Sequence, residues 1–111
     1  MVAITNILIT ALSLVAVAVA GDMYLYDCAN CKCDAKSQRT GFSGDTGCIS
    51  NFGGAIAAGL TRSGSRATTC SYFSDSACSQ QFQSAGVNGG QTWGCTAANQ
   101  RIQSIRCYYN V

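Results

Sequence analysis

Cysteine and aspartate are the residue types in this chain with the most chemistry to offer. Eight cysteines occur in 111 residues, and the stretch YDCANCKC from Tyr26 to Cys33 contains three of them. The chain has no histidine, and its five acidic side chains are all aspartate. Cysteines this close together could hold a metal, exchange disulfides or belong to a disulfide framework, and the compartment in which the chain folds decides between these roles.

The first 20 residues predict secretion. The run MVAITNILITALSLVAVAVA is apolar from Ile7 to Val19, and its small residues at the end are typical of a signal peptide cleaved after Ala20. The alternative is a membrane anchor, but the run contains Thr10 and Ser13 and barely reaches the thickness of a bilayer. We therefore expect a signal peptide over 1–20 and a single secreted domain over 21–111.

Secretion favours a structural role for every cysteine. Small extracellular domains bury too little apolar surface to offset the loss of chain entropy, and disulfides make up the difference. A zinc site would need reduced thiolates or histidines, so we predict no metal and no cofactor. The residues expected to form four disulfides are Cys28, Cys31, Cys33, Cys48, Cys70, Cys78, Cys95 and Cys107.

The polar side chains do not suggest catalysis. Without histidine there is no Ser-His or Cys-His nucleophile. The spacing of the aspartates brings no two of them together as a glycosidase would require, and aspartate beside Gly, Cys or Ser is typical of turns. We predict a non-enzymatic protein without catalytic residues; the aspartates concerned are Asp22, Asp27, Asp34, Asp45 and Asp75.

The charges point to no nucleic-acid partner. The seven basic residues are scattered along the chain and the formal net charge is only +2, so no basic stripe is expected. Basic and aromatic residues do come together near the carboxyl terminus, although an outward-facing strand edge would give the same pattern. The candidate binding residues are Tyr24, Tyr26, Arg101, Arg106, Tyr108 and Tyr109.

Three segments read as strands because they are rich in aromatic and β-branched residues and lack proline: 22–27, 67–73 and 103–110. The stretch CISNFGGAIAAGL (48–60) has apolar residues at helical spacing, but its glycines weaken a helix. A short helix and a compact loop both fit this stretch.

An internal repeat gives more information than any single segment. Tyr26 stands five places before Cys31, and Phe73 stands five places before Cys78. Each of these cysteines is followed 17 positions later by the cysteine of a Gly-Cys pair, at 47–48 and 94–95, so that all correspondences share one offset of 47. The repeat predicts two tandem motifs over 21–66 and 67–111.

Each half has the same pattern: an aromatic residue, a buried position five places later and a distant serine, Ser63 in the first half and Ser104 in the second. This pattern resembles the Greek-key motif of the βγ-crystallin superfamily. The resemblance implies that the aromatic residue braces a folded-over hairpin and that the serine hydroxyl ties this hairpin to the sheet. Two such motifs form one domain. We therefore predict an all-β, two-sheet Greek-key sandwich held by four disulfides. The calcium-binding pattern of that family is incomplete here, so no strong calcium site is expected.

The repeat also suggests how the cysteines pair. Bridges Cys31–Cys48 and Cys78–Cys95 would each close one motif. Cys70 and Cys107, both in strand-like segments, would then pair, and Cys28–Cys33 would form a local staple. This is one of the many pairings that eight cysteines allow.

The arrangement is also similar to small secreted cysteine-rich proteins of fungi, on the C-x-C near the mature start, the segment CSYFSDSAC and the terminal SIRC. Many such proteins are host-directed effectors or antimicrobial toxins. The alternative resemblance is to the killer toxins of smut fungi, an α/β sandwich. It would place helices over 45–60 and 75–85, with Ser74 or Asp75 as an N-cap.

The expected function is binding. We predict a secreted, non-enzymatic effector or toxin-like protein that binds a protein or cell-surface target of a host or competitor through exposed aromatic residues. Trp93, beside Gly94 and Cys95, is expected to lie in the core. The alternative is a membrane-active or cell-wall-active killer toxin that exposes the segment GGAIAAGL, although that segment has no basic residue before Arg62.

Overall fold

The computed structural model describes residues 20–64, 66–87 and 91–109, so the predicted signal peptide lies outside the described residues except for Ala20. The described chain contains only β-strands and no helix. The strands are β1 (Gly21–Tyr26), β2 (Ser37–Phe42), β3 (Gly44–Asp45), β4 (Ala55–Arg62), β5 (Thr68–Phe73), β6 (Gln81–Val87), β7 (Trp93–Ile102) and β8 (Ser104–Tyr109).

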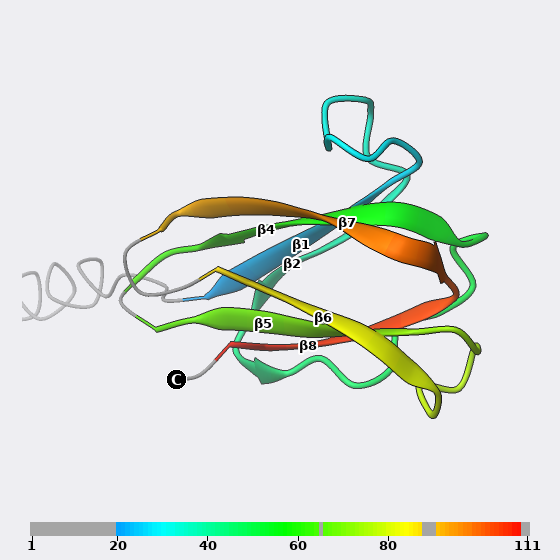
Figure 1. Ribbon diagram of the computed structural model, residues 1–111. Helices are drawn as coiled ribbons and strands as arrows, with labels where there is room; N and C mark the ends of the chain where they lie inside the picture. Colours follow the sequence, from blue (N-terminus) through cyan, green and yellow to red (C-terminus); the bar gives the residue numbers. More distant parts are fainter. Residues whose placement is uncertain (1–19, 65, 88–90, 110–111) are drawn as a thin grey trace, which may run out of the picture.

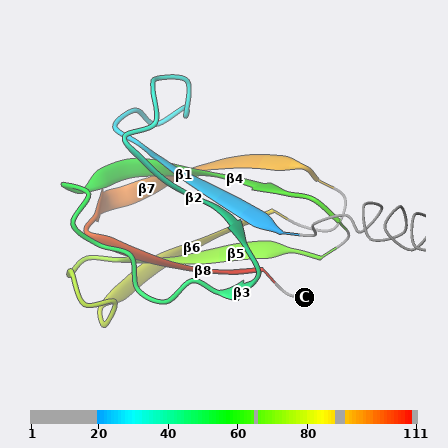
Figure 2. The ribbon, with the colours of Figure 1, turned by 180° about the vertical axis from the view of Figure 1, so that it is seen from behind.

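The strands form two antiparallel sheets that pack face to face. Sheet A has the order β2-β1-β4-β7, and sheet B has the order β3-β8-β5-β6. Figure 1 shows sheet A as the upper layer and sheet B as the lower one, and Figure 2 shows β3 beside β8 in the lower layer. The prediction of a small two-sheet sandwich is confirmed. The α/β alternative is wrong for the described chain, because its two expected helices fall on loops and on β4 and β6.

The two halves of the chain exchange one strand each. β3 belongs to the first half but pairs with β8 in sheet B, and β7 belongs to the second half but pairs with β4 in sheet A. Each sheet therefore contains three strands from one half and the third strand from the other, which is the order of two interlocked Greek-key units.

The strand register repeats with the offset seen in the sequence. Tyr26 lies opposite Ala57, and Phe73 lies opposite Ser104, 47 positions later in both strands. The counterpart of Ser104 is therefore Ala57. The role expected of Ser63 is wrong, because Ser63 lies past the end of β4 and its backbone N–H donates to the Ala20 carbonyl.

The core is built by side chains that point alternately inward and outward along the strands. β1 turns Met23 and Leu25 inward, where they are fully buried, and leaves Asp22 and Tyr24 partly exposed on its other face. Tyr72 is one of the two tyrosines that sheet B contributes to the core cluster. Its hydroxyl donates to the Thr96 carbonyl of sheet A over 2.7 Å, and burial raises its pKa well above the usual range of tyrosine. The two layers are thus joined by apolar packing and by a partly buried hydrogen bond.

The segment 48–60 is neither a helix nor one loop. Ile49 forms an isolated bridge with Ile105, and a regular strand, β4, begins at Ala55. β4 is central in sheet A, and its outer face is also covered, so small apolar residues occupy both faces and the alternation expected of a half-exposed strand is lost. The three segments predicted as strands correspond to β1, β5 and β8.

All eight cysteines are paired, but two predicted bridges are wrong. Cys31–Cys48 and Cys78–Cys95 do not form, because Cys48 follows β3 and Cys95 lies in β7, and each of these strands has moved to the sheet of the other half. The observed bridges are Cys28–Cys33, Cys31–Cys95, Cys48–Cys78 and Cys70–Cys107. The two bridges that join the halves use the cysteines of the repeat with exchanged partners.

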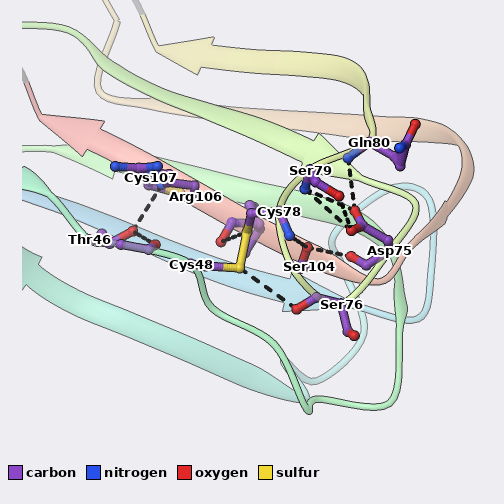
Figure 3. Close-up of a disulfide and its surroundings, with 12 residues drawn as sticks. Thr46, Cys48, Asp75, Ser76, Cys78, Ser79, Gln80, Ser104, Arg106 and Cys107 are labelled. Atoms are coloured by element: carbon purple, nitrogen blue, oxygen red, sulfur yellow. Dashed lines mark hydrogen bonds between the residues drawn. A yellow bond between two sulfur atoms is a disulfide. The ribbon is translucent and has the colours of Figure 1, made fainter.

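The β5–β6 hairpin is tied down by one buried serine (Figure 3). The Ser104 hydroxyl donates to the Asp75 carbonyl over 2.5 Å and accepts from the Cys78 backbone N–H over 3.2 Å. Within the hairpin, the Asp75 carboxylate accepts from the backbone N–H groups of Ser79 and Gln80. At the corresponding positions of the β1–β2 hairpin, Cys28 and Cys33 form a disulfide instead.

Replacement of this serine tests its role. We expect Ser104→Ala to lower the free energy of unfolding by about 2 kcal/mol, because it removes two hydrogen bonds and leaves the Cys78 N–H without its partner. Urea unfolding of the disulfide-bonded protein measures the effect. The control is Ser84→Ala on β6, where the serine is exposed; equal stability of the two variants would contradict this role.

Candidate binding face

The six residues predicted as a binding surface do not form one surface. Tyr109 lies in the core and Tyr26 is buried on the outer side of sheet A, 0% and 8% exposed, so the prediction of these two as binding residues is wrong. Tyr108 and Arg106 point outward from sheet B. Tyr24 lies on the outer face of sheet A, and Arg101 hydrogen-bonds to the Gly53 carbonyl and contacts Asp27. The predicted set is therefore divided between opposite faces of the sandwich and its interior.

Two of the aspartates, Asp45 and Asp75, are held by structural hydrogen bonds. Hydrogen bonds from the Arg106 side chain, and then from the Gly47 backbone, lower the pKa of Asp45 to about 2. Hydrogen bonds from Ser79 and Gln80 lower the pKa of Asp75 to about 2. Both carboxyls thus remain ionised at neutral pH, whereas a general acid needs a pKa near the working pH. Their environments favour a structural role for both.

Trp93 is a surface residue, so the prediction that it lies in the core is wrong. It is 43% exposed and lies opposite Thr61 on the outer face of sheet A. Its six-membered ring occupies the space over Gly59, where a Cβ would lie only 2.2 Å from the indole Cη2. Glycine at this position lets the indole pack onto the backbone of β4, and a glycine inside a strand often marks such a close approach.

The strand register places a second aromatic ring beside this one. Tyr24 lies opposite Gly59 on one side and opposite Gln38 on the other, so all three residues point outward from sheet A. Asp22 and Thr61 form the next outward row, and the Thr61 hydroxyl donates to the Asp22 carboxylate over 2.8 Å. We call this surface the aromatic face; its residues are Asp22, Tyr24, Gln38, Gly59, Thr61 and Trp93.

The aromatic face is assembled from both halves of the chain. Trp93 comes from the second half on the exchanged strand β7, and the other residues come from the first half. Cys95, opposite Gly59, carries the disulfide to Cys31 and so fixes β7 to the β1–β2 hairpin next to the face. The hairpin stands on the outer side of sheet A in Figure 1.

Sheet B shows what the fold itself requires at these positions. Tyr108 and Arg106 are the counterparts of Thr61 and Gly59, 47 positions later. Because Asp45 lies opposite Tyr108 and Trp93 lies opposite Thr61, Asp45 occupies in sheet B the position that Trp93 occupies in sheet A. Arg106 forms an ion pair with Asp45, and this pair takes the place of the indole over glycine. On sheet B a polar ion pair therefore occupies the places of Trp93 and Gly59, so the indole on sheet A is not needed to build the sandwich.

Other kinds of site are absent from the described ranges. No pocket opens among these residues, and they include no cluster of three or more His, Cys, Asp or Glu side chains that could hold a metal ion. They also include no helix long and apolar enough to cross a membrane. The aromatic face is flat, and a partner would have to bind across it.

Comparison with protein-family models, curated proteins and solved structures finds no match to this chain. The resemblances to βγ-crystallins and to secreted fungal proteins therefore stay predictions.

The contact between Trp93 and Gly59 is open to a direct test. Gly59→Ala should displace the indole and destabilise the protein by about 1–3 kcal/mol, the usual cost of overpacking. Since Trp93 is the only tryptophan, its emission wavelength and its quenching by iodide report the displacement. The matched control is Gly86→Ala on β6, where an added Cβ would meet its neighbours at an ordinary 3.5 Å. Unchanged emission in both variants would contradict the contact.

Proposed function

We propose that this chain is a secreted, non-enzymatic binding protein of the effector or toxin-like kind, and that it attaches to its target through the aromatic face. The observation that carries the proposal is the exposed indole of Trp93, held over Gly59 and beside Tyr24 at positions where the scaffold accepts polar residues. Aromatic side chains that lie next to one another on a surface, where the fold does not need them, point to an interaction.

The disulfides support an extracellular setting. Four disulfides in a small domain are typical of extracellular proteins. The predicted signal peptide over 1–20 agrees with this. A rigid scaffold of this kind keeps its surface in one conformation outside the cell.

Physical properties of the aromatic face favour binding. Tryptophan and tyrosine provide large contact areas and are enriched among the residues that contribute most to binding energy. Trp93 is already packed onto Gly59, and β7 is fixed by the Cys31–Cys95 bridge. Little side-chain and loop entropy is therefore lost when a partner binds, which raises affinity.

The membrane-active alternative loses the element on which it was based. Most of the segment GGAIAAGL lies in β4, where Ala55, Ala57, Ala58 and Leu60 are at most 1% exposed. A strand buried at the centre of a sheet cannot enter a lipid surface without unfolding the domain. Cell-wall attachment does not need this segment and is compatible with the aromatic face.

Removal of the indole tests the proposal. The mature protein, labelled with a fluorophore at its amino terminus, is added to intact yeast, bacterial and plant cells, and retention is measured by flow cytometry. We expect retention on at least one cell type, with a loss of affinity of at least about tenfold in Trp93→Ala. The matched control is Tyr108→Ala, which removes an aromatic residue of similar exposure, 47%, from sheet B.

Three results would overturn the proposal: no retention on any of the cells, equal retention of Trp93→Ala and the native protein, or an equal loss in both variants. Circular dichroism of each variant establishes that it is folded. Dye release from phosphatidylcholine–phosphatidylserine vesicles tests the membrane alternative, and we expect the vesicles to stay intact.

A further inference from the structure

We infer that the ligand of the aromatic face is a neutral polysaccharide of β-linked hexoses, of the chemical class that includes cellulose, chitin and β-1,3-glucan. The inference rests on the proposed function and specifies its ligand. It is drawn from the shape, the polar groups and the charge of the face.

The shape favours a polymer over a small molecule. Small-molecule sites are concave and enclose most of the ligand surface, whereas no pocket opens among the described residues. A flat face can still bind a chain that lies across it, because successive units each contribute contacts. Tyr24 on β1 and the indole of Trp93 over β4 stand on neighbouring strands, so one extended chain can contact both rings.

The aromatic rings match one side of a hexose. A pyranose with equatorial hydroxyls directs its axial C–H groups to the two faces of the ring, which makes these faces apolar and weakly positive. The face of an indole or phenol carries the negative end of the ring quadrupole, so the two surfaces attract when stacked. β-Linked glucose and N-acetylglucosamine polymers present such faces along the whole chain.

The polar residues match the other groups of a sugar. Gln38 is exposed beside Tyr24, and its amide can both donate to and accept from hydroxyl groups. The Asp22 carboxylate accepts from the Gly41 N–H and from the Thr61 hydroxyl, each over 2.8 Å. These bonds hold the carboxylate and the threonine oxygen in place, and their remaining lone pairs can accept from equatorial hydroxyls.

The charge of the face favours a neutral polymer. Its one charged residue is the acidic Asp22 and it contains no basic residue, so the face offers no attraction to pectin-like polymers or nucleic acids. Among the cations near the face, Lys36 and Arg101 are both directed to Asp27. A second copy of the chain would bring two Asp22 carboxylates together. It would also find only six residues, where stable protein interfaces use roughly 20–30 a side.

Sedimentation with insoluble polysaccharides tests the inference. The disulfide-bonded mature protein is mixed with cellulose, chitin, insoluble β-1,3-glucan and, as the anionic control, calcium-crosslinked polygalacturonate. We expect it to sediment with at least one of the three neutral polymers and not with polygalacturonate. Trp93→Ala and Tyr24→Ala should each weaken binding by at least tenfold, and Tyr108→Ala should bind as the native protein does. Soluble hexamers of the bound polymer should shift the Trp93 emission to shorter wavelength.

The outcomes separate this inference from the proposed function. If no neutral polymer is bound while Trp93-dependent retention on cells persists, the inference is wrong and the proposed function stands. A target that protease treatment removes from the cells would then identify a protein partner. Trp93-dependent self-association in sedimentation equilibrium, without polysaccharide binding, would identify a second copy and also overturn the inference. Binding that is equal in native protein and Trp93→Ala would exclude the aromatic face itself.

Discussion

The exchange of third strands between the two halves is the constraint on which the rest of this structure depends. β3 completes sheet B and β7 completes sheet A, so neither sheet reaches four strands without the other half of the chain. Cys31–Cys95 and Cys48–Cys78 fix both exchanged strands across sequence separations of 64 and 30. Each bridge stabilises the fold by on the order of 4 kcal/mol through restriction of the unfolded chain. The aromatic face exists only after this exchange, because β7 carries Trp93 to Gly59.

The two halves share a backbone pattern but differ in how their hairpins and outer faces are built. Cys31 and Cys78 both adopt positive φ, 57° and 55°, at equivalent places in the hairpins. Residues other than glycine rarely adopt this backbone conformation, and each of these two cysteines is held by a disulfide to the other half of the chain. Outside this shared frame the chemistry diverges: sheet B carries an Asp45–Arg106 ion pair where sheet A carries an indole over glycine. This asymmetry on a symmetric frame is the basis on which we propose the aromatic face as the binding surface.

Sequence reasoning predicted the parts of the fold that rest on local pattern. β1, β5 and β8 are rich in aromatic and β-branched residues, and the two-sheet sandwich followed from the resemblance of the repeated pattern to a Greek-key motif. β2 and β4 escaped prediction because β2 is a polar edge strand and β4 is apolar on both faces, so neither alternates clearly. The repeat identified equivalent cysteines correctly. It carried no information on whether they pair within a half or between halves, since only the strand exchange decides that.

The position of Trp93 was also not predictable from the sequence. Its neighbours Gly94 and Cys95 suggested a core position, but burial depends on the face of the strand, and no pattern in the polar strand β7 fixes that face. The glycine that accommodates its ring lies 34 positions earlier, at Gly59. An isolated glycine inside a strand-forming stretch was the one signal in the sequence that a bulky group approaches there.

A disulfide map of the unreduced protein tests the strand exchange most directly. With thiols blocked, trypsin and chymotrypsin separate the relevant cysteines into the fragments 27–32, 43–52, 74–82 and 94–101. We expect 43–52 to be joined to 74–82, and 27–32, which contains both Cys28 and Cys31, to be joined to 94–101 and to the small fragment 33–36. Fragment 43–52 joined to 27–32, with 74–82 joined to 94–101, would close each half on itself. It would contradict the exchange and, with it, the assembly of the aromatic face.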